Sequence, residues 1–286
     1  MSVWFSAGYA FASAATELAA GAASRASNVS TAFLLSAPAA LVVSIGAAVV
    51  SPGELLTESI LWGVAAGIVG GTALPVAYHA LALGPIGVVA SVIACTSTIS
   101  LSLAGIVLEG MPPTAVWIGM MLSLTAIVFL AQRSRHSVPV SPRHQHGSHP
   151  TLSIKLGIVT GLGFAAFTLL MSFAQRDDGG PVALVAARAA VLVVAIVFAA
   201  MVRARFNPGR GVVASSVSAG VLDVGGNLFL LAALATTPLI VVAVVGATSP
   251  AIAAAGALIL LRERLNRWQV AGLALAASGA VLASGA

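Results

Sequence analysis

Three ionisable side chains lie inside stretches of small and apolar residues. They are Glu17, Arg188 and Asp223. An ionisable group near the centre of a bilayer costs roughly 2.5–3.5 kcal/mol on insertion scales, so such a residue suggests a function. Two acids and one base leave one negative charge if all three are ionised. Because burial disfavours a charged carboxylate, one of the acids could hold a proton that is released when a cation binds.

Arg188 is the natural partner for Asp223, and we expect the two side chains to lie within ion-pair distance. Asp223 and Asn227 are four residues apart, so they would share one face of a helix. Two interpretations stay open. The pair could be purely architectural, as many buried ion pairs are. Alternatively, the planar guanidinium of Arg188 could hold a substrate carboxylate.

Glu17 is predicted to lie past the middle of the first membrane helix. Helical spacing places it roughly on one face with Ser6, Ser13 and Ser24, which is typical of a cavity wall. We expect its carboxylate to take up a proton in one state and a cation in another, and so to couple transport to protons. The alternative is a capped polar residue near a helix end.

Further polar residues lie next to prolines in apolar stretches. Tyr78 and His79 follow Pro75, and Thr248 and Ser249 precede Pro250. Proline breaks the backbone ladder and can leave carbonyls facing a cavity, so these four residues are predicted to line the site. A lone histidine such as His79 is also compatible with a structural role. No metal or cofactor is predicted, because the loop histidines at 144, 146 and 149 lack cysteine or carboxylate partners.

These side chains must be positioned by membrane helices. Hydrophobic residues make up 59% of the 286-residue chain and charged residues 7%, whereas soluble domains are about a quarter charged. A bilayer-spanning helix needs about 20 apolar residues. We therefore predict an all-α membrane protein with ten spans, near residues 3–23, 31–50, 58–80, 86–108, 114–131, 155–174, 182–201, 212–233, 238–261 and 268–285.

An internal repeat organises the ten spans. Residues 85, 88, 89 and 90 match residues 238, 241, 242 and 243, with the same residue types 153 positions later. This register predicts two five-helix repeats, at 1–131 and 155–286, joined by a polar linker at 132–154. Because five is odd, the repeats must cross the membrane in opposite senses. Such inverted repeats are typical of secondary transporters, whose site lies near the midplane between the repeats.

The distribution of charge excludes some functions and predicts an orientation. The net charge is +5, but the basic residues are scattered over loops, which argues against nucleic-acid binding. Most of them occupy the odd-numbered connections, so the 132–154 linker and the other odd connections are predicted to be cytoplasmic. The single Cys95 excludes a disulfide framework. No motif of a membrane protease or hydrolase is present, so we do not expect an enzyme.

Several short motifs resemble the drug/metabolite transporter superfamily, in its ten-helix EamA-type branch. They are Glu263-Arg264-Leu265, Gly272 and Gly279, the Ala-Leu-Ala-Thr-Thr-Pro run at 233–238, and Thr248-Ser249-Pro250. The resemblance implies export of small metabolites such as amino acids, or of drugs, across the plasma (inner) membrane. The stretch around Glu17 is similar to the first helix of four-helix multidrug transporters. Two features depart from the family: the first helix lacks its Trp-Gly-Ser/Thr-Asn element, and the charge distribution opposes its usual orientation.

Together these features predict a secondary-active transporter that works by alternating access in the lipid bilayer, as a monomer or homodimer. Its expected partners are a small-molecule substrate and protons. The alternative is a flippase for a lipid-linked metabolite, which would need a groove open to the lipid.

Overall fold

The described structure is entirely helical. The computed structural model describes residues 2–26, 29–83, 86–130, 150–176, 179–202, 209–261 and 267–285. Within them the helices are α1 (Ser2–Ala26), α2 (Val29–Val50), α3 (Thr57–Leu83), α4 (Ile86–Glu109), α5 (Thr114–Leu130), α6 (Pro150–Gln175), α7 (Gly180–Met201), α8 (Arg210–Thr236), α9 (Leu239–Gly246), α10 (Ser249–Leu261) and α11 (Arg267–Ser284).

Nine of the ten predicted spans correspond to one helix each, and their ends differ by a few residues. The ninth, predicted at 238–261, is instead two helices, α9 and α10. The break in the backbone ladder expected at Pro250 is therefore an interruption of the helix, and it falls at the turn of residues 247–248. Pro75 does not interrupt α3, which continues to Leu83. A proline inside a helix removes one backbone hydrogen bond without ending the helix if neighbouring groups satisfy the freed carbonyl.

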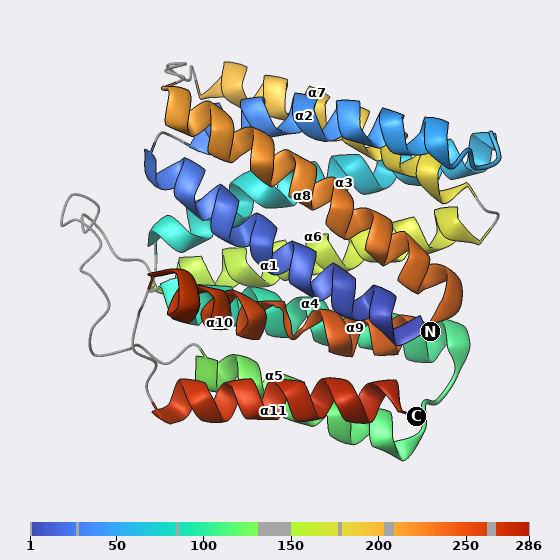
Figure 1. The fold of residues 1–286 in the computed structure, drawn as a ribbon, viewed down its shortest axis with the longest axis vertical. Helices are drawn as coiled ribbons and strands as arrows, with labels where there is room; N and C mark the ends of the chain where they lie inside the picture. Colours follow the sequence, from blue (N-terminus) through green and yellow to red (C-terminus); the bar gives the residue numbers. More distant parts are fainter. Residues whose placement is uncertain are drawn as a thin grey trace. The chain divides into compact units, whose positions relative to one another are not determined.

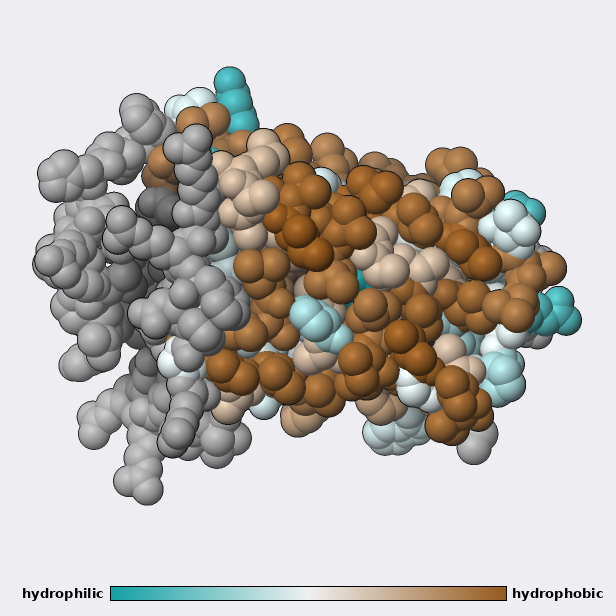
Figure 2. All heavy atoms as spheres, turned by 90° about the horizontal axis from the view of Figure 1, so that it is seen from above, coloured by the Kyte–Doolittle hydropathy of each residue, from teal (hydrophilic) through white to brown (hydrophobic). Residues whose placement is uncertain are grey.

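The helices have the length and surface of membrane spans. Six of them in the described residues are long and apolar enough to cross a bilayer. Large apolar side chains are exposed on several of these helices, including Val42, Val107 and Val193. Figure 2 shows a face on which apolar side chains predominate. A soluble protein rarely exposes so much contiguous apolar surface, so the chain is a multi-pass membrane protein.

The helices group into two compact units. The first comprises Met1–Pro75 and Ala166–Thr237, and the second comprises Val76–Ala165 and Pro238–Ala286. In the first unit α2 lies beside α7 and α8, and α1 lies against α8; in the second, α5 pairs with α11 and α4 with α9 (Figure 1). Each unit therefore combines helices from both halves of the sequence.

Glycines allow the closest helix contacts in the first unit. A Cβ atom on Gly63 would clash with the backbone of Ala183, and one on Gly67 would clash with the backbone of Ala187. Both glycines lie on α3 and both alanines on α7. The small-xxx-small spacing of these glycines predicts close packing of this kind. The core beside this contact is apolar and includes Ala66, Leu184 and Val224.

Candidate functional site

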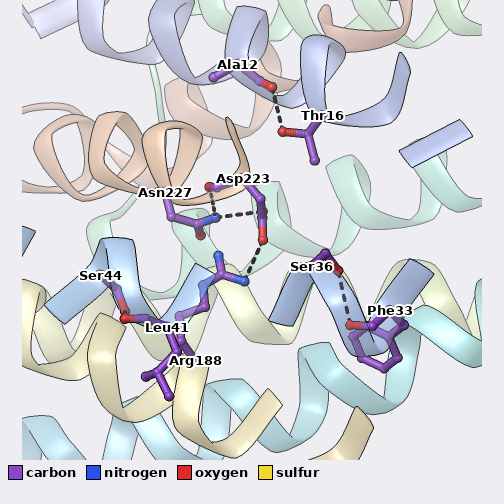
Figure 3. A network of polar contacts seen from close by, with 9 residues as sticks. All are labelled: Ala12, Thr16, Phe33, Ser36, Leu41, Ser44, Arg188, Asp223 and Asn227. Atoms are coloured by element: carbon purple, nitrogen blue, oxygen red, sulfur yellow. Dashed lines mark hydrogen bonds and ion pairs between the residues drawn. The ribbon is translucent and has the colours of Figure 1, made fainter. Parts of the chain in front are cut away.

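An ion pair with a buried arginine lies in the first unit. The Nη1 atom of Arg188 on α7 is 2.6 Å from Oδ2 of Asp223 on α8, and it is the only ion pair among the described residues. The side chain of Arg188 is 7% exposed and that of Asp223 is 37% exposed. Figure 3 shows the guanidinium pointing from α7 toward the carboxylate. The predicted proximity of these two residues is confirmed.

Asn227 completes the network from the next turn of α8. Its Nδ2 atom donates to Oδ1 of Asp223 at 3.1 Å and to the backbone carbonyl of Asp223 at 2.7 Å (Figure 3). Each carboxylate oxygen of Asp223 therefore accepts a bond from a different side chain. The predicted shared face of Asp223 and Asn227 produces a direct contact, and Asn227 fixes the carboxylate toward Arg188.

The guanidinium has unused hydrogen-bonding capacity. The Nε atom of Arg188 is buried and has no hydrogen-bond partner among the described residues. An arginine side chain carries five N–H donors in a rigid fork, and leaving one of them buried without an acceptor costs free energy. A ligand with a carboxylate or another planar acceptor could satisfy this edge, while the exposed third of Asp223 could contact a cationic group.

The hydroxyl groups drawn around the ion pair are directed along their own helices. Thr16 donates to the carbonyl of Ala12 at 2.9 Å, and Ser44 donates to that of Leu41 at 2.8 Å. Ser36 likewise donates to its own helix (Figure 3). Because intrahelical bonds of this kind are common for serine and threonine in apolar helices, they do not indicate a ligand. The ionic network remains the distinctive polar feature of the first unit.

A second group of predicted site residues lies at the interruption between α9 and α10, in the second unit. Thr248 and Ser249 are both buried. The Thr248 hydroxyl donates to the carbonyl of Val245 at 2.6 Å, and the Thr248 carbonyl accepts from the first N–H groups of α10. Because Pro250 has no N–H, the carbonyl of Gly246 lacks its usual helical partner. Interrupted membrane helices expose such backbone groups to substrates and ions in other transporters.

The remaining predicted residues are not part of either group. His79 is exposed near the end of α3. Glu17 belongs to α1 and Tyr78 to α3, but their side chains lie outside the described residues, as do the histidines of the linker and the Glu263-Arg264-Leu265 motif. Their predicted roles therefore stay predictions.

Comparison with known protein families identifies the second half of the chain. Residues 151–285 match the model of the EamA-like transporter family. The chain carries an EamA-like transporter domain. No curated protein matches the chain. A domain of this family suggests a membrane transporter, in agreement with the apolar helices.

The EamA-like domain contains the whole ionic network and the interruption of the ninth span. Glu17, Tyr78 and His79 precede it. A solved structure, titled only as the crystal structure of a protein, is similar to the chain with a TM-score of 0.77 and 16% sequence identity. The similarity covers 97% of this chain and 95% of the other, so the fold extends over both halves, including the part before the EamA-like domain.

The structure also reveals relationships that the sequence analysis missed. The side chain of Glu109 accepts a hydrogen bond from the backbone N–H of the first residue of α9. A second repeat register links α2 to α7 at a separation of 151 residues. It matches Leu-Val-Val-Ser-Ile at 41–45 with Leu-Val-Val-Ala-Ile at 192–196. This signal was present in the sequence, but a search at the single separation of 153 residues does not detect it.

Proposed function

We propose that the chain is a secondary-active transporter that moves small metabolites, such as amino acids or cationic compounds, by alternating access and in exchange for protons. The observation that carries the proposal is the Arg188–Asp223 pair inside a membrane protein, in which the buried Nε atom of Arg188 has no partner in the described part of the chain. Membrane proteins retain such groups mainly at substrate and ion sites.

Contacts at equivalent positions support two inverted repeats. A Cβ atom on Gly67 of α3 would clash with Ala187 of α7, and one on Gly220 of α8 would clash with Ser36 of α2. Gly67 and Gly220 are 153 residues apart, and Ser36 and Ala187 are 151 residues apart. Exchanging the two halves therefore converts one contact into the other, as a twofold axis between repeats requires.

The second unit supports the same relationship in the α5–α11 pair. A Cβ atom on Gly119 would be 2.7 Å from the carbonyl oxygen of Gly279, and one on Gly272 would be 3.1 Å from that of Ala126. Gly272 is the equivalent of Gly119, and Gly279 is the equivalent of Ala126, both at a separation of 153 residues. One contact therefore maps onto the other and the α5–α11 helix pair maps onto itself, as expected of a twofold interface.

The chemistry of the network suits a zwitterion. The carboxylate of an amino acid would bind the fork of Arg188, since arginine recognises carboxylates with two parallel bonds. Its ammonium group would bind Asp223, whose side chain is partly exposed. One internal ion pair would then be exchanged for two pairs with the substrate. A compound with only a positive charge would use Asp223 alone, and a proton on Glu17 would be exchanged as the substrate leaves.

Reconstitution into liposomes with an imposed pH gradient tests this proposal. We expect Asp223→Asn to lower substrate flux about tenfold at every pH gradient, the equivalent of one lost contact of about 1.4 kcal/mol. Glu17→Gln, which resembles the protonated carboxylate, should abolish only the response of the flux to the gradient. Candidate substrates come from a thermal-shift screen of amino acids, cationic drugs and lipid phosphates.

Thermal stability in detergent provides the control for both variants. If Asp223→Asn lowers the melting temperature but leaves the flux unchanged, the ion pair is architectural and the proposed site is wrong. If Glu17→Gln remains fully driven by the pH gradient, the proton is carried by another group. Stabilisation by lipid phosphates alone would favour the flippase.

A further inference from the structure

The first turn of α9 is held by a carboxylate from a different helix. Oε2 of Glu109 accepts a hydrogen bond from the backbone N–H of Leu239 at 2.8 Å, across 130 residues of sequence. The first N–H groups of a helix have no partner within it. The residue before this helix, Pro238, offers no side-chain cap, so Glu109 supplies the acceptor that a serine or aspartate supplies at other helices.

Glu109 is unfavourably placed for its own helix. It is the last residue of α4, where the carbonyl end of the helix dipole repels a negative charge. Gly110, with φ of +93°, ends α4 immediately afterwards in the left-handed region, and the chain turns away. The same negative charge is favourable at the N-terminus of α9. The position of Glu109 is therefore explained by α9 rather than by α4.

The helix that Glu109 holds is short and enclosed. It has eight residues, and all side chains from Leu239 to Val245 are buried. It packs against α4 closely enough that a Cβ atom on Gly105 would be 3.0 Å from the backbone nitrogen of Ile240. Its other end is the interruption that carries Thr248 and Ser249. With a rise of 1.5 Å per residue, the carboxylate and the interruption are about 12 Å apart, or about two turns of helix.

We infer that Glu109 is a positioning residue for the interruption between α9 and α10. The inference rests on the proposed function in so far as Thr248 and Ser249 contact substrate. Because the regular helical hydrogen-bond ladder is interrupted by the turn at 247–248, the bond to Glu109 and the packing on α4, α5 and α11 hold α9 in place. Loss of the carboxylate lets the first turn of α9 open, and the polar residues at its far end lose their fixed place.

Cysteine labelling measures this effect without a transport assay. Thr248→Cys is introduced into the full chain in a Cys95→Ala background, and N-ethylmaleimide is the probe. We expect Glu109→Ala to raise the rate of labelling at position 248 by about fivefold to tenfold, the effect of removing a helix cap on local opening. Glu109→Gln, which keeps an oxygen acceptor but not the charge, should give a smaller increase. Glu54→Ala is the matched control, since Glu54 is likewise an exposed acid, in the segment between α2 and α3.

Flux measurements on the same Glu109 variants, with Thr248 and Cys95 intact, complete the test. We expect Glu109→Ala to raise the KM for substrate at least as much as it lowers the maximal rate, and Glu109→Gln to restore part of the loss.

Labelling at the unsubstituted rate in Glu109→Ala, or an equal change in Glu54→Ala, would overturn the inference. So would faster labelling with unchanged KM, since α9 would then be held by Glu109 without any effect on the site. If no variant and no parent protein transports, the proposed function fails while the labelling result still decides the role of Glu109 in holding α9.

Discussion

The proposed repeat relates the α2–α3 helix pair of the first unit to the α7–α8 pair, and the two pairs differ in chemistry. The glycine contact between α3 and α7 is repeated between α8 and α2 at equivalent positions. The residues equivalent to Arg188, Asp223 and Asn227 are Ala37, Gly70 and Leu74. Ala37 and Leu74 belong to one apolar cluster, whereas Arg188 and Asn227 both contact Asp223.

This difference bears on whether the ionic network serves the helix packing or a separate function. Under the proposed repeat, the α2–α3 pair holds the corresponding place with small and apolar residues at all three positions. The ionic network is therefore not required by the helix geometry, and a buried ion pair is weak evidence for stability in any case. Its presence in only one of two equivalent places favours a role in binding.

Replacing the charged residues of the α7–α8 pair with apolar ones should give the largest effect on stability. Asp223→Leu leaves the buried guanidinium of Arg188 without a counter-charge, and we expect a loss of about 3 kcal/mol in the free energy of unfolding. The double variant Arg188→Met/Asp223→Leu removes both charges and should return close to the stability of the parent protein. Chemical denaturation in detergent micelles measures both values.

The double variant also separates the two interpretations of the pair. We expect it to fold and to have no measurable flux in liposomes. Parent-level flux would show that the charges serve only the structure. A double variant as unstable as Asp223→Leu alone would show that the packing, and not the unpaired charge, is responsible for the loss.

The sequence predicts the parts of the structure that depend on composition and spacing. Apolar length determines the spans, and the four-residue spacing of Asp223 and Asn227 gives their contact. The pairing of Arg188 with Asp223 follows because few charges are available in an apolar core. The Glu109–Leu239 bond was not predictable in this way, since it depends on where α4 and α9 end relative to each other in space. The sequence predicts a broken hydrogen-bond ladder at Pro250 but not two separate helices, because a proline shows which bond is lost but not how neighbouring bonds rearrange.

Alanine substitutions at the glycine contacts should destabilise the protein less than Asp223→Leu does, and by the same amount in both halves of the sequence. Gly67→Ala and Gly220→Ala each place a Cβ atom against a backbone carbonyl that cannot move away easily. We expect each to cost about 2 kcal/mol in the free energy of unfolding, typical of overpacking. Gly225→Ala is the matched control on α8, because a Cβ atom there would have nothing within 4 Å. It should be neutral or stabilising, since alanine favours helix formation.

Unequal losses in the free energy of unfolding for Gly67→Ala and Gly220→Ala would show that the two glycine contacts are not equivalent. A loss confined to Gly220→Ala would mean that α2 and α8 approach closely for a reason that α3 and α7 do not share. Equal losses, with Gly225→Ala unaffected, would show that the two contacts are energetically as well as geometrically equivalent.

Asn227→Leu should give the smallest effect, because it changes one position of the network to the residue found at its equivalent, Leu74. The substitution removes two hydrogen bonds from Nδ2, at 2.7 and 3.1 Å, but leaves the ion pair. We expect a loss of about 1 kcal/mol in stability, the usual net value for a hydrogen bond. Oδ1 of Asp223 then loses its donor, so the carboxylate can rotate away from Arg188. The flux should therefore fall by a larger factor than the stability change alone explains, and the KM should rise while the maximal rate changes little.

Asn227→Asp is not a suitable alternative, since it would add a second charge beside Asp223. A KM equal to that of the parent protein, with the expected loss of stability, would show that Asn227 supports the helix and does not orient the carboxylate.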